Sequence, residues 1–155
     1  MPSTAAATPA AAESATREPA DIVVEFLDLC AADEIDRALE LLDPDVLYTN
    51  VGLPTVRGKA RVRALAERFD SPASGFEVYY RAVAQNGDTV LTDRVDALTY
   101  GPFRSQFWVY GRFEVRDGLI TVWRDSFDWF AITRASLRGI AGILLPALRA
   151  KPPAF

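Results

Sequence analysis

Ionisable side chains alternate with apolar ones in two segments of the chain, and their spacing suits proton transfer. Arg94 and Asp96 share one face of an extended segment, because side chains two positions apart in a strand point the same way. By the same rule, Asp125 shares a face with Trp123 and Phe127. A carboxylate among aromatic side chains is costly to bury unless a cation or hydrogen-bond donor meets it. The pattern therefore indicates a ligand-binding or active site.

A third extended segment adds two uncharged polar groups. Tyr48 and Asn50 lie on one face of this segment. If the three faces converge, one cavity holds two carboxylates, a guanidinium, a phenol and an amide between apolar walls. This combination is typical of a small-molecule or catalytic site.

A purely structural interpretation accounts for the same residues. Arg94 and Asp96 could form an ordinary ion pair on a solvated sheet face. Asp125 could bridge at the surface to Arg124 or Arg112. Pattern alone leaves both interpretations open.

The composition restricts how protons can be moved. The 155-residue chain contains no histidine, which excludes Ser-His-Asp and Cys-His chemistry and every histidine-ligated metal site. Its single cysteine, Cys30, permits no internal disulfide and no cysteine-based metal site, and its apolar helix face indicates a small core residue. A net charge of −4 without a basic run argues against a nucleic-acid partner. Carboxylates, Tyr or Lys with shifted pKa values must therefore transfer protons, unless a cofactor does.

Hydrophobic periodicity predicts the elements that position these residues. Residues 1–18, rich in Ala, Thr, Ser and Pro, predict a disordered tail before a single domain over residues 19–150. Apolar spacings of three and four predict helices, and a spacing of two beside Asn-Gly and Asp-Gly turns predicts strands. The expected helices cover 22–30, 33–42, 59–69 and 132–149, and the expected strands cover 46–51, 76–84, 89–100, 103–116 and 119–129.

The order of these elements predicts an α+β fold. Three helices from the N-terminal half cover one face of a curved antiparallel (mixed) sheet, a further helix ends the chain, and the resulting cone encloses a pocket. The chain shows neither a signal-peptide pattern nor a stretch of about 20 apolar residues, which favours a cytoplasmic location.

Three segments resemble the limonene-1,2-epoxide hydrolase family, whose fold is the nuclear-transport-factor-2-like cone. The segments are Leu47-Tyr48-Thr49-Asn50-Val51-Gly52, Leu91-Thr92-Asp93-Arg94-Val95-Asp96-Ala97-Leu98 and Trp123-Arg124-Asp125-Ser126-Phe127-Asp128. The family has Tyr-x-Asn, Arg-x-Asp and Trp-Arg-Asp-x-Phe-Asp in this order. The resemblance runs from about Pro19 to the end of the last strand. One departure is Ser126, which stands where close relatives have Tyr but alternates away from Asp125.

The resemblance implies an epoxide hydrolase that works without a metal or cofactor. It implies that Asp125 is the general base and that Tyr48 and Asn50 hold the attacking water. Asp96 would be the general acid, and Arg94 would orient both carboxylates. Water would attack the epoxide directly, so no covalent ester would form.

The protonation states that this mechanism needs pose a specific question. Arg94 alone would lower the pKa of both carboxylates, whereas a general acid must be protonated. Burial and repulsion between the carboxylates must therefore raise one pKa, and the two would titrate as a coupled pair.

The family resemblance also leads to expectations about the substrate. The expected pocket walls are apolar and are formed by Leu98, Trp108, Trp123, Phe127, Phe26 and Leu65. Such walls favour a lipophilic epoxide, for example a terpene, sterol or fatty-acid oxide, with water as the second substrate.

The sequence also leads to expectations about the oligomer, the C-terminal helix and alternative functions. The resemblance implies a homodimer, because relatives with this fold are commonly dimers, and the open sheet face is the expected interface. For the apolar C-terminal helix, core or dimer packing is the main expectation, and membrane contact through Arg134, Arg138 and Arg149 is the minor one. The alternative functions are a ketosteroid-isomerase-like or polyketide-cyclase-like enzyme and a non-catalytic module that binds lipophilic ligands.

Overall fold

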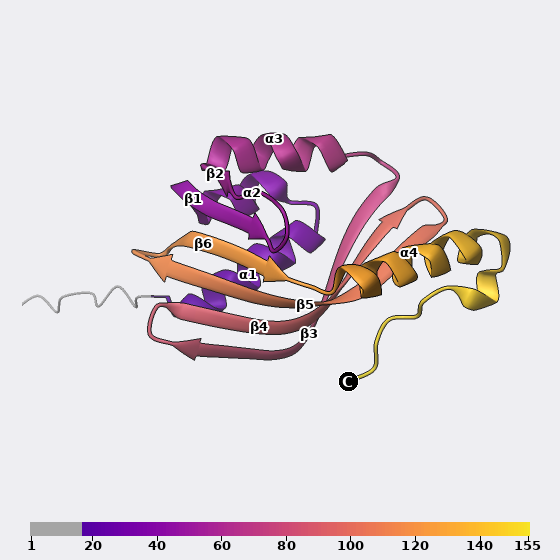
Figure 1. Cartoon of the computed structure of the whole chain (residues 1–155). Coiled ribbons are helices and arrows are strands. Elements are labelled where there is room, and N and C mark those ends of the chain that lie inside the picture. The colour runs from indigo at the N-terminus through magenta and orange to yellow at the C-terminus, as the bar shows by residue number, and fades with distance from the viewer. Residues whose placement is uncertain (1–16) are drawn as a thin grey trace, which may run out of the picture.

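A six-stranded mixed sheet forms the centre of the protein, which we describe from a computed structural model covering residues 17–155. The strand order is β2-β1-β6-β5-β4-β3, in which β1 and β6 are parallel and every other neighbouring pair is antiparallel. Helices α1, α2 and α3 lie on one side of the curved sheet, and α4 extends from its far end (Figure 1). The predicted α+β class is therefore confirmed.

The N-terminal helices bury an apolar stripe against the sheet. They are α1 (Pro19–Ala31), α2 (Ile35–Glu40) and α3 (Lys59–Phe69). Ile22, Val23, Phe26 and Leu27 recur on one face of α1, and all four are buried. The core of the domain lies between this face and the inner face of the sheet.

Short turns connect most of the long strands of the sheet. The elements are β1 (Leu42–Asn50), β2 (Val56–Arg57), β3 (Ser74–Asn86), β4 (Thr89–Tyr100), β5 (Phe103–Arg116) and β6 (Leu119–Ser126). Asp117 and Gly118 both have positive φ, 50° and 78°, as the two-residue hairpin between β5 and β6 requires. This turn sets the register that places β6 beside β5.

The C-terminal helix covers the part of β5 that has no β6 residues paired with it. Strand β6 ends opposite Tyr110, so it leaves the first part of β5 unpaired on that side. Helix α4 (Trp129–Leu144) packs there, and a 3-10 turn, η1 (Pro146–Leu148), follows it. Asp128 caps the start of α4 by accepting from the backbone N–H of Phe130 at 2.8 Å. A Cβ atom on Gly139 would lie 2.5 Å from the backbone oxygen of Arg104, so glycine allows this close approach.

Several predicted boundaries were wrong. The second helix ends at Glu40 rather than at 42, because β1 already begins at Leu42 and pairs there with β6. The segment 52–58 contains a short strand, β2, which is too short for apolar periodicity to predict. The last strand stops at Ser126 and α4 starts at Trp129, so the predicted 132–149 helix begins and ends too late.

The predicted disordered tail covers residues 1–18, and residues 1–16 of it lie outside the residues that the structure describes. Within residues 17–155, no helix has both the length and the apolar character needed to cross a membrane.

Candidate active site

Three buried ionic side chains form a connected cluster at the centre of the sheet. Arg94 donates from Nε to Asp96 Oδ1 at 2.9 Å and from Nη2 to Asp96 Oδ2 at 3.2 Å. Nη2 of Arg94 also lies 2.9 Å from Asp125 Oδ2. The exposed fractions are 1% for Arg94, 6% for Asp96 and 5% for Asp125. One guanidinium therefore bridges two carboxylates that are nearly out of contact with water.

This burial decides between the two interpretations of the sequence pattern. An ordinary surface ion pair would be solvated, whereas this cluster is among the most buried groups of the domain. Arg112 pairs instead with Glu114, at 2.7 Å, and Arg124 is exposed. The alternative in which Asp125 bridges to Arg112 or Arg124 is therefore wrong.

A glycine in β5 permits the bridge, and the sequence reasoning missed it. Arg94 belongs to β4 and Asp125 to β6, so the arginine side chain must cross β5. The β5 residue aligned with both Thr92 and Asp125 is Gly111. A Cβ atom at Gly111 would overlap Arg94 Nη1 and Thr92 Oγ1 and would lie 2.8 Å from a ring carbon of Phe113. An isolated glycine inside a predicted strand was the available signal, because it often marks a close approach.

We expect Gly111→Ala to lower activity far more than it lowers stability. The added methyl group displaces the Arg94 guanidinium and with it the geometry of both carboxylates, and misplacement by about 1 Å can cost about 100-fold in rate. Overpacking of this kind destabilises by about 1–3 kcal/mol. The measurements are kcat and the free energy of unfolding in urea.

Gly75→Ala is the matched control for that substitution. Its Cβ would lie 2.6 Å from the hydroxyl of Thr99, the end of a movable side chain remote from the cluster. Activity in Gly111→Ala equal to that of Gly75→Ala would contradict the crossing role of Gly111.

The two oxygens of Asp125 have different surroundings. Oδ2 accepts from Trp123 Nε1 at 2.9 Å and faces Arg94 Nη2. Oδ1 is buried and accepts no hydrogen bond from the described residues. Asp125 therefore has one oxygen held by donors and one oxygen still able to accept a proton.

Tyr48 and Asn50 lie next to Asp125 because β1 runs parallel to β6. Asn50 pairs in register with Asp125, and Tyr48 pairs with Trp123. Asn50 Nδ2 donates to the Tyr48 hydroxyl at 2.7 Å, and the Tyr48 ring lies 4.0 Å from the Trp123 ring. Since the Tyr48 oxygen already accepts from Asn50, its own O–H remains able to donate. All five polar side chains singled out in the sequence therefore lie in one neighbourhood.

Burial raises the pKa of both carboxylates despite the arginine. Loss of solvation raises the pKa of Asp96 to about 6, and Arg94 opposes this rise. Burial also raises the pKa of Asp125, against the opposing effects of Arg94 and Trp123. Burial, and next the nearby Asp125 charge, raise the pKa of Tyr48 to about 12, so its phenol stays neutral. The expectation that burial can outweigh the arginine agrees with these directions.

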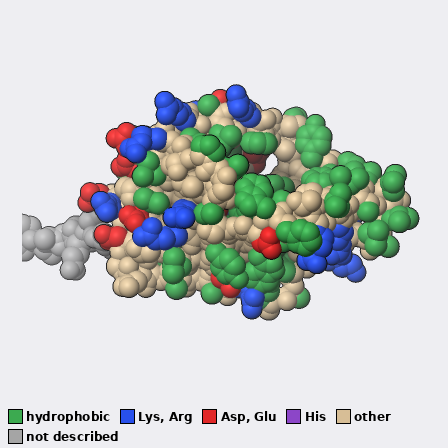
Figure 2. Space-filling model, in the orientation of Figure 1, with side chains coloured by type: hydrophobic (Ala, Val, Ile, Leu, Met, Phe, Trp, Pro, Cys, Tyr) green, Lys and Arg blue, Asp and Glu red, His purple; other side chains and the backbone are tan. Residues whose placement is uncertain are grey.

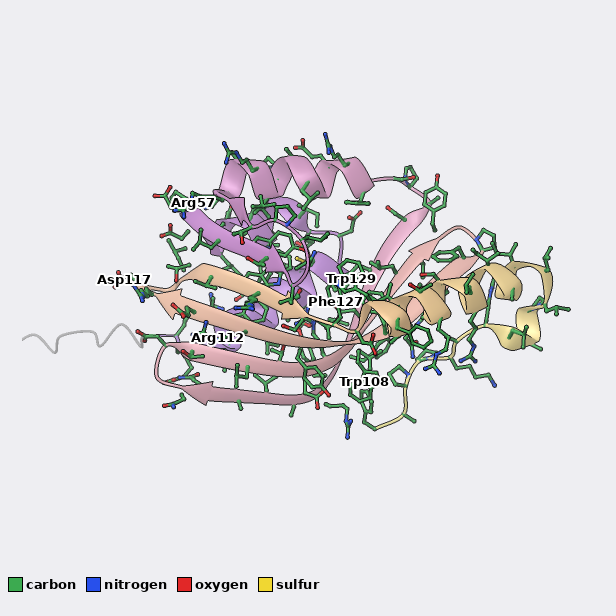
Figure 3. The ribbon with its side chains drawn as sticks, viewed as in Figure 1. Arg57, Trp108, Arg112, Asp117, Phe127 and Trp129 are labelled. Atoms are coloured by element: carbon green, nitrogen blue, oxygen red, sulfur yellow. The ribbon has the colours of Figure 1, made fainter. Side chains whose placement is uncertain are left out.

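The predicted wall residues do not all face this cluster. Trp108 pairs in register with Val95, whose side chain alternates away from Arg94 and Asp96. It stacks instead with Arg81, 4.6 Å from the ring centroid, and lies near Phe155. Figure 3 shows Trp108 on the side of the sheet away from Phe127 and Trp129. The prediction that Trp108 lines the pocket was therefore wrong, because strand alternation places it on the outer face.

The other expected wall residues occupy several environments. Phe26 is fully buried and packs edge-on against Trp123, with ring centroids 4.9 Å apart. Trp123 is therefore a hydrogen-bond donor to Asp125 as well as an apolar surface. Leu98 shares the Asp96 face of β4 and is about half exposed, and Leu65 is half-buried on α3.

The last strand ends in an aromatic cluster next to the site. Phe127 packs edge-on against Trp129, with ring centroids 4.9 Å apart. Trp129 Nε1 donates to the backbone oxygen of Val51 at 3.0 Å, and Val51 directly follows Asn50. The first turn of α4 is therefore anchored to the strand that carries Tyr48 and Asn50.

The surface of the protein has two hollows, and one of them is a cavity that lies apart from the polar cluster. Figure 2 shows an opening beneath α3 with hydrophobic side chains around it. A separate cavity of about 460 Å³ lies between α4 and β5 and is lined by Gln106, Phe107, Trp108, Ala131, Arg134, Ala135, Arg138 and Ala150. This second cavity contains none of the five clustered polar residues.

The arrangement can accept one proton and supply another within a single buried site. Asp125 offers a free carboxylate oxygen, and Asp96 has a pKa close to neutrality. Within residues 17–155, no group of three or more Asp, Glu or Cys side chains is arranged to hold a metal ion. The two carboxylates are of the kind that carry general acid–base chemistry.

Comparison with known proteins finds the same family that the three sequence segments resemble. The sequence model of the limonene-1,2-epoxide hydrolase catalytic domain matches residues 17–138. Epoxide hydrolase EphG of Mycobacterium tuberculosis (strain ATCC 25618 / H37Rv) is 41% identical over 128 residues, which cover 83% of this chain and 85% of EphG.

Solved structures extend the comparison to the fold. The structure of an LEH-like epoxide hydrolase from M. tuberculosis superposes with a TM-score of 0.82 at 40% identity and covers 86% of this chain and 95% of that one. An NTF2-like protein from Burkholderia pseudomallei K96243 has a TM-score of 0.68 at 16% identity, covering 78% of this chain and 98% of that chain. The second likeness shows the fold alone.

Proposed function

Because the chain belongs to the limonene-1,2-epoxide hydrolase family and is an epoxide hydrolase, we propose that it opens a lipophilic epoxide to a vicinal diol in one step. The observation that carries this proposal is the asymmetry of Asp125. Its Oδ2 is held by Arg94 and Trp123, and its buried Oδ1 accepts no hydrogen bond from the described residues.

Asp125 is the general base in this proposal. A water molecule bound at Oδ1 gives a proton to the carboxylate as its oxygen forms a bond to an epoxide carbon. The Tyr48 hydroxyl and the Asn50 amide, which bond each other at 2.7 Å, orient that water. The raised pKa of Asp125 makes it a stronger base than an exposed carboxylate.

Asp96 is the general acid. Its pKa of about 6 keeps part of the population protonated near neutral pH, and this proton goes to the epoxide oxygen as the ring C–O bond breaks. The carboxylate pair starts and ends with one proton: Asp96 gives its proton to the product, and Asp125 receives one from the attacking water. Arg94 contacts both groups, so it stabilises the negative charge on whichever carboxylate carries it.

The geometry supports a hydrolase better than an isomerase of the same fold. An isomerase needs one carboxylate base and a neutral donor for its oxyanion. Here a guanidinium holds a second carboxylate through two hydrogen bonds, an arrangement suited to two linked proton transfers. No feature of the site favours a polyketide-cyclase-like reaction.

The apolar surroundings favour a lipophilic substrate such as a terpene, sterol or fatty-acid oxide. Phe127, Trp129 and Leu98 lie near the polar cluster and offer hydrophobic contacts. We further propose that the protein is a homodimer through the outer sheet face, where Leu91, Trp108 and Tyr110 are exposed.

The test is diol formation from limonene oxide, a sterol 5,6-oxide and an epoxy fatty acid in ¹⁸O-labelled water. With enzyme in excess over substrate, direct attack puts label into the diol during the first turnover. An ester intermediate would deliver an unlabelled carboxylate oxygen first. Unlabelled first-turnover diol would overturn the one-step mechanism, and absence of diol from all three epoxides would overturn the substrate proposal.

A further inference from the structure

The C-terminal helix carries its large apolar side chains on the face that points away from the protein. Phe130, Leu137, Ile140 and Leu144, spaced by three, four and seven residues, are all exposed, and we call them the α4 apolar face. Leu137 is 63% exposed and Leu144 is 82% exposed. A helix that only completes a core would turn these residues inward.

Small residues occupy the opposite, inward side of α4. Gly139 and Gly142 are its buried positions, and Ser136 lies 3.3 Å from the hydroxyl of Ser105 on β5. A Cβ at Gly139 would collide with β5, so this side is committed to close packing on the strand. The outward α4 apolar face is therefore not available to the core of its own domain.

The charge around this face is of one sign. Residues 129–155 contain four basic residues and no acidic residue, whereas the preceding 128 residues contain 13 basic and 21 acidic ones, a net charge of −8. The basic residues of the segment are Arg134, Arg138, Arg149 and Lys151. Figure 2 shows hydrophobic side chains gathered over α4 with Lys and Arg beside them.

Two of these arginines also line the 460 Å³ cavity beside α4. Arg134 and Arg138 line it together with Gln106. Arg138 uses Nε to donate to the backbone oxygen of Leu148 at 2.8 Å, and the described residues accept no hydrogen bond from its terminal nitrogens. The cavity thus offers guanidinium donors to an anionic group such as a phosphate.

We propose that the α4 apolar face docks on an anionic phospholipid surface. The 16 residues of α4 span about 24 Å, less than the hydrocarbon thickness of about 30 Å, so the helix lies in the interface plane. Its apolar side chains enter the acyl boundary while Arg134 and Arg138 meet phosphate groups. The exposed Leu145 and Leu148 extend the same contact beyond the helix.

Charge favours lipid over a second copy of the chain at this face. A symmetric contact between two α4 helices would bring Arg134 and Arg138 of both copies together, and residues 129–155 contain no acidic partner for them. Anionic headgroups supply the missing negative charge. The family match ends at residue 138, so the second half of this surface lies beyond it.

The test is flotation of the full chain with vesicles of phosphatidylcholine alone and with 30% phosphatidylglycerol. We expect binding to the anionic vesicles, weakened by salt, and little binding to the neutral ones. Arg134→Gln with Arg138→Gln should weaken anionic binding about 10- to 30-fold, because each cation contributes about 1 kcal/mol near the surface. Leu137→Gln with Leu144→Gln should weaken it at least about tenfold through lost apolar burial.

Phe69→Gln is the matched control, because Phe69 is 72% exposed on α3 outside the α4 apolar face. It should bind vesicles like the wild type. Circular dichroism and diol formation check that the variants are folded. Equal binding to neutral and anionic vesicles would overturn the proposal, and so would absence of binding to both. If light scattering then shows a dimer that becomes monomeric in Leu137→Gln/Leu144→Gln, the α4 apolar face joins two copies of the chain instead.

Discussion

Asp125→Asn is expected to reduce diol formation by about 10²- to 10⁴-fold, the usual contribution of a general base. The amide cannot accept a proton from water at neutral pH. It is close in shape to the carboxylate, and its oxygen can still accept from Trp123 and Arg94. The measurement is kcat under saturating epoxide, together with ligand binding followed by Trp fluorescence.

The same variant should remain folded. Burial raises the pKa of Asp125, so the charged form is costly in the folded state and the neutral amide removes that cost. Asp93→Asn is the control, because Asp93 lies on the opposite face of β4 and its Oδ1 accepts no hydrogen bond from the described residues. Activity of Asp125→Asn within threefold of Asp93→Asn would show that another group takes the proton.

Arg94→Met is expected to lower the free energy of unfolding at pH 7 by about 3–5 kcal/mol, the usual cost of removing one partner of a buried charge cluster. Methionine fills most of the arginine volume, so the lost stability is due mainly to charge. Two buried carboxylates are left without their cation. The measurement is urea unfolding at pH 7 and at pH 5. Arg112→Met is the control, since its ion pair with Glu114 is exposed and should change stability by less than about 1 kcal/mol.

The deficit of Arg94→Met should shrink as the pH falls. Burial already raises the pKa of Asp96 to about 6 in the folded wild type, and loss of the arginine raises the folded pKa of both carboxylates further. A folded state that binds protons more tightly than the unfolded chain gains stability as pH falls from neutrality toward about 4. A deficit of equal size at pH 5 and pH 7 would assign the loss to packing instead of charge.

A second substitution separates these causes. Adding Asp96→Asn to Arg94→Met removes one of the two unpaired charges and should recover part of the lost stability at pH 7. No recovery would argue against charge as the cause.

Most of the sheet was predictable because strand formation depends on near neighbours in the chain. The first hairpin turn is formed by Gly87 and Asp88, one residue later than the predicted Asn86-Gly87 turn, because Asn86 still pairs with Thr89. The Asp117-Gly118 turn was predicted correctly, and the bounds of β4 and β5 agree with the predicted 89–100 and 103–116. The helix over 59–69 was also predicted correctly. Strand β2 was missed because two residues carry no periodicity, and its pairing depends on β1.

The errors in the site came from a different source. Trp108 was chosen as a wall residue for its type, whereas its place on β5 turns it to the outer face. Gly111 was overlooked because it matters only for the Arg94 side chain, which crosses it from another strand. Neither fact is visible from the neighbouring residues in the chain.

By itself, then, the sequence determined which polar residues share a strand face, since side-chain alternation is a local property of the backbone. Arg94 with Asp96, and Tyr48 with Asn50, were paired in this way, and the α+β class followed from the element order. Only the tertiary structure decided that Arg94 reaches Asp125 across β5, that burial raises the Asp96 pKa to about 6, and that α4 turns its apolar side outward. These properties depend on contacts between segments that are far apart in the chain. Such contacts determine how strongly a side chain is shielded from water and which way it points, and no local sequence pattern contains them.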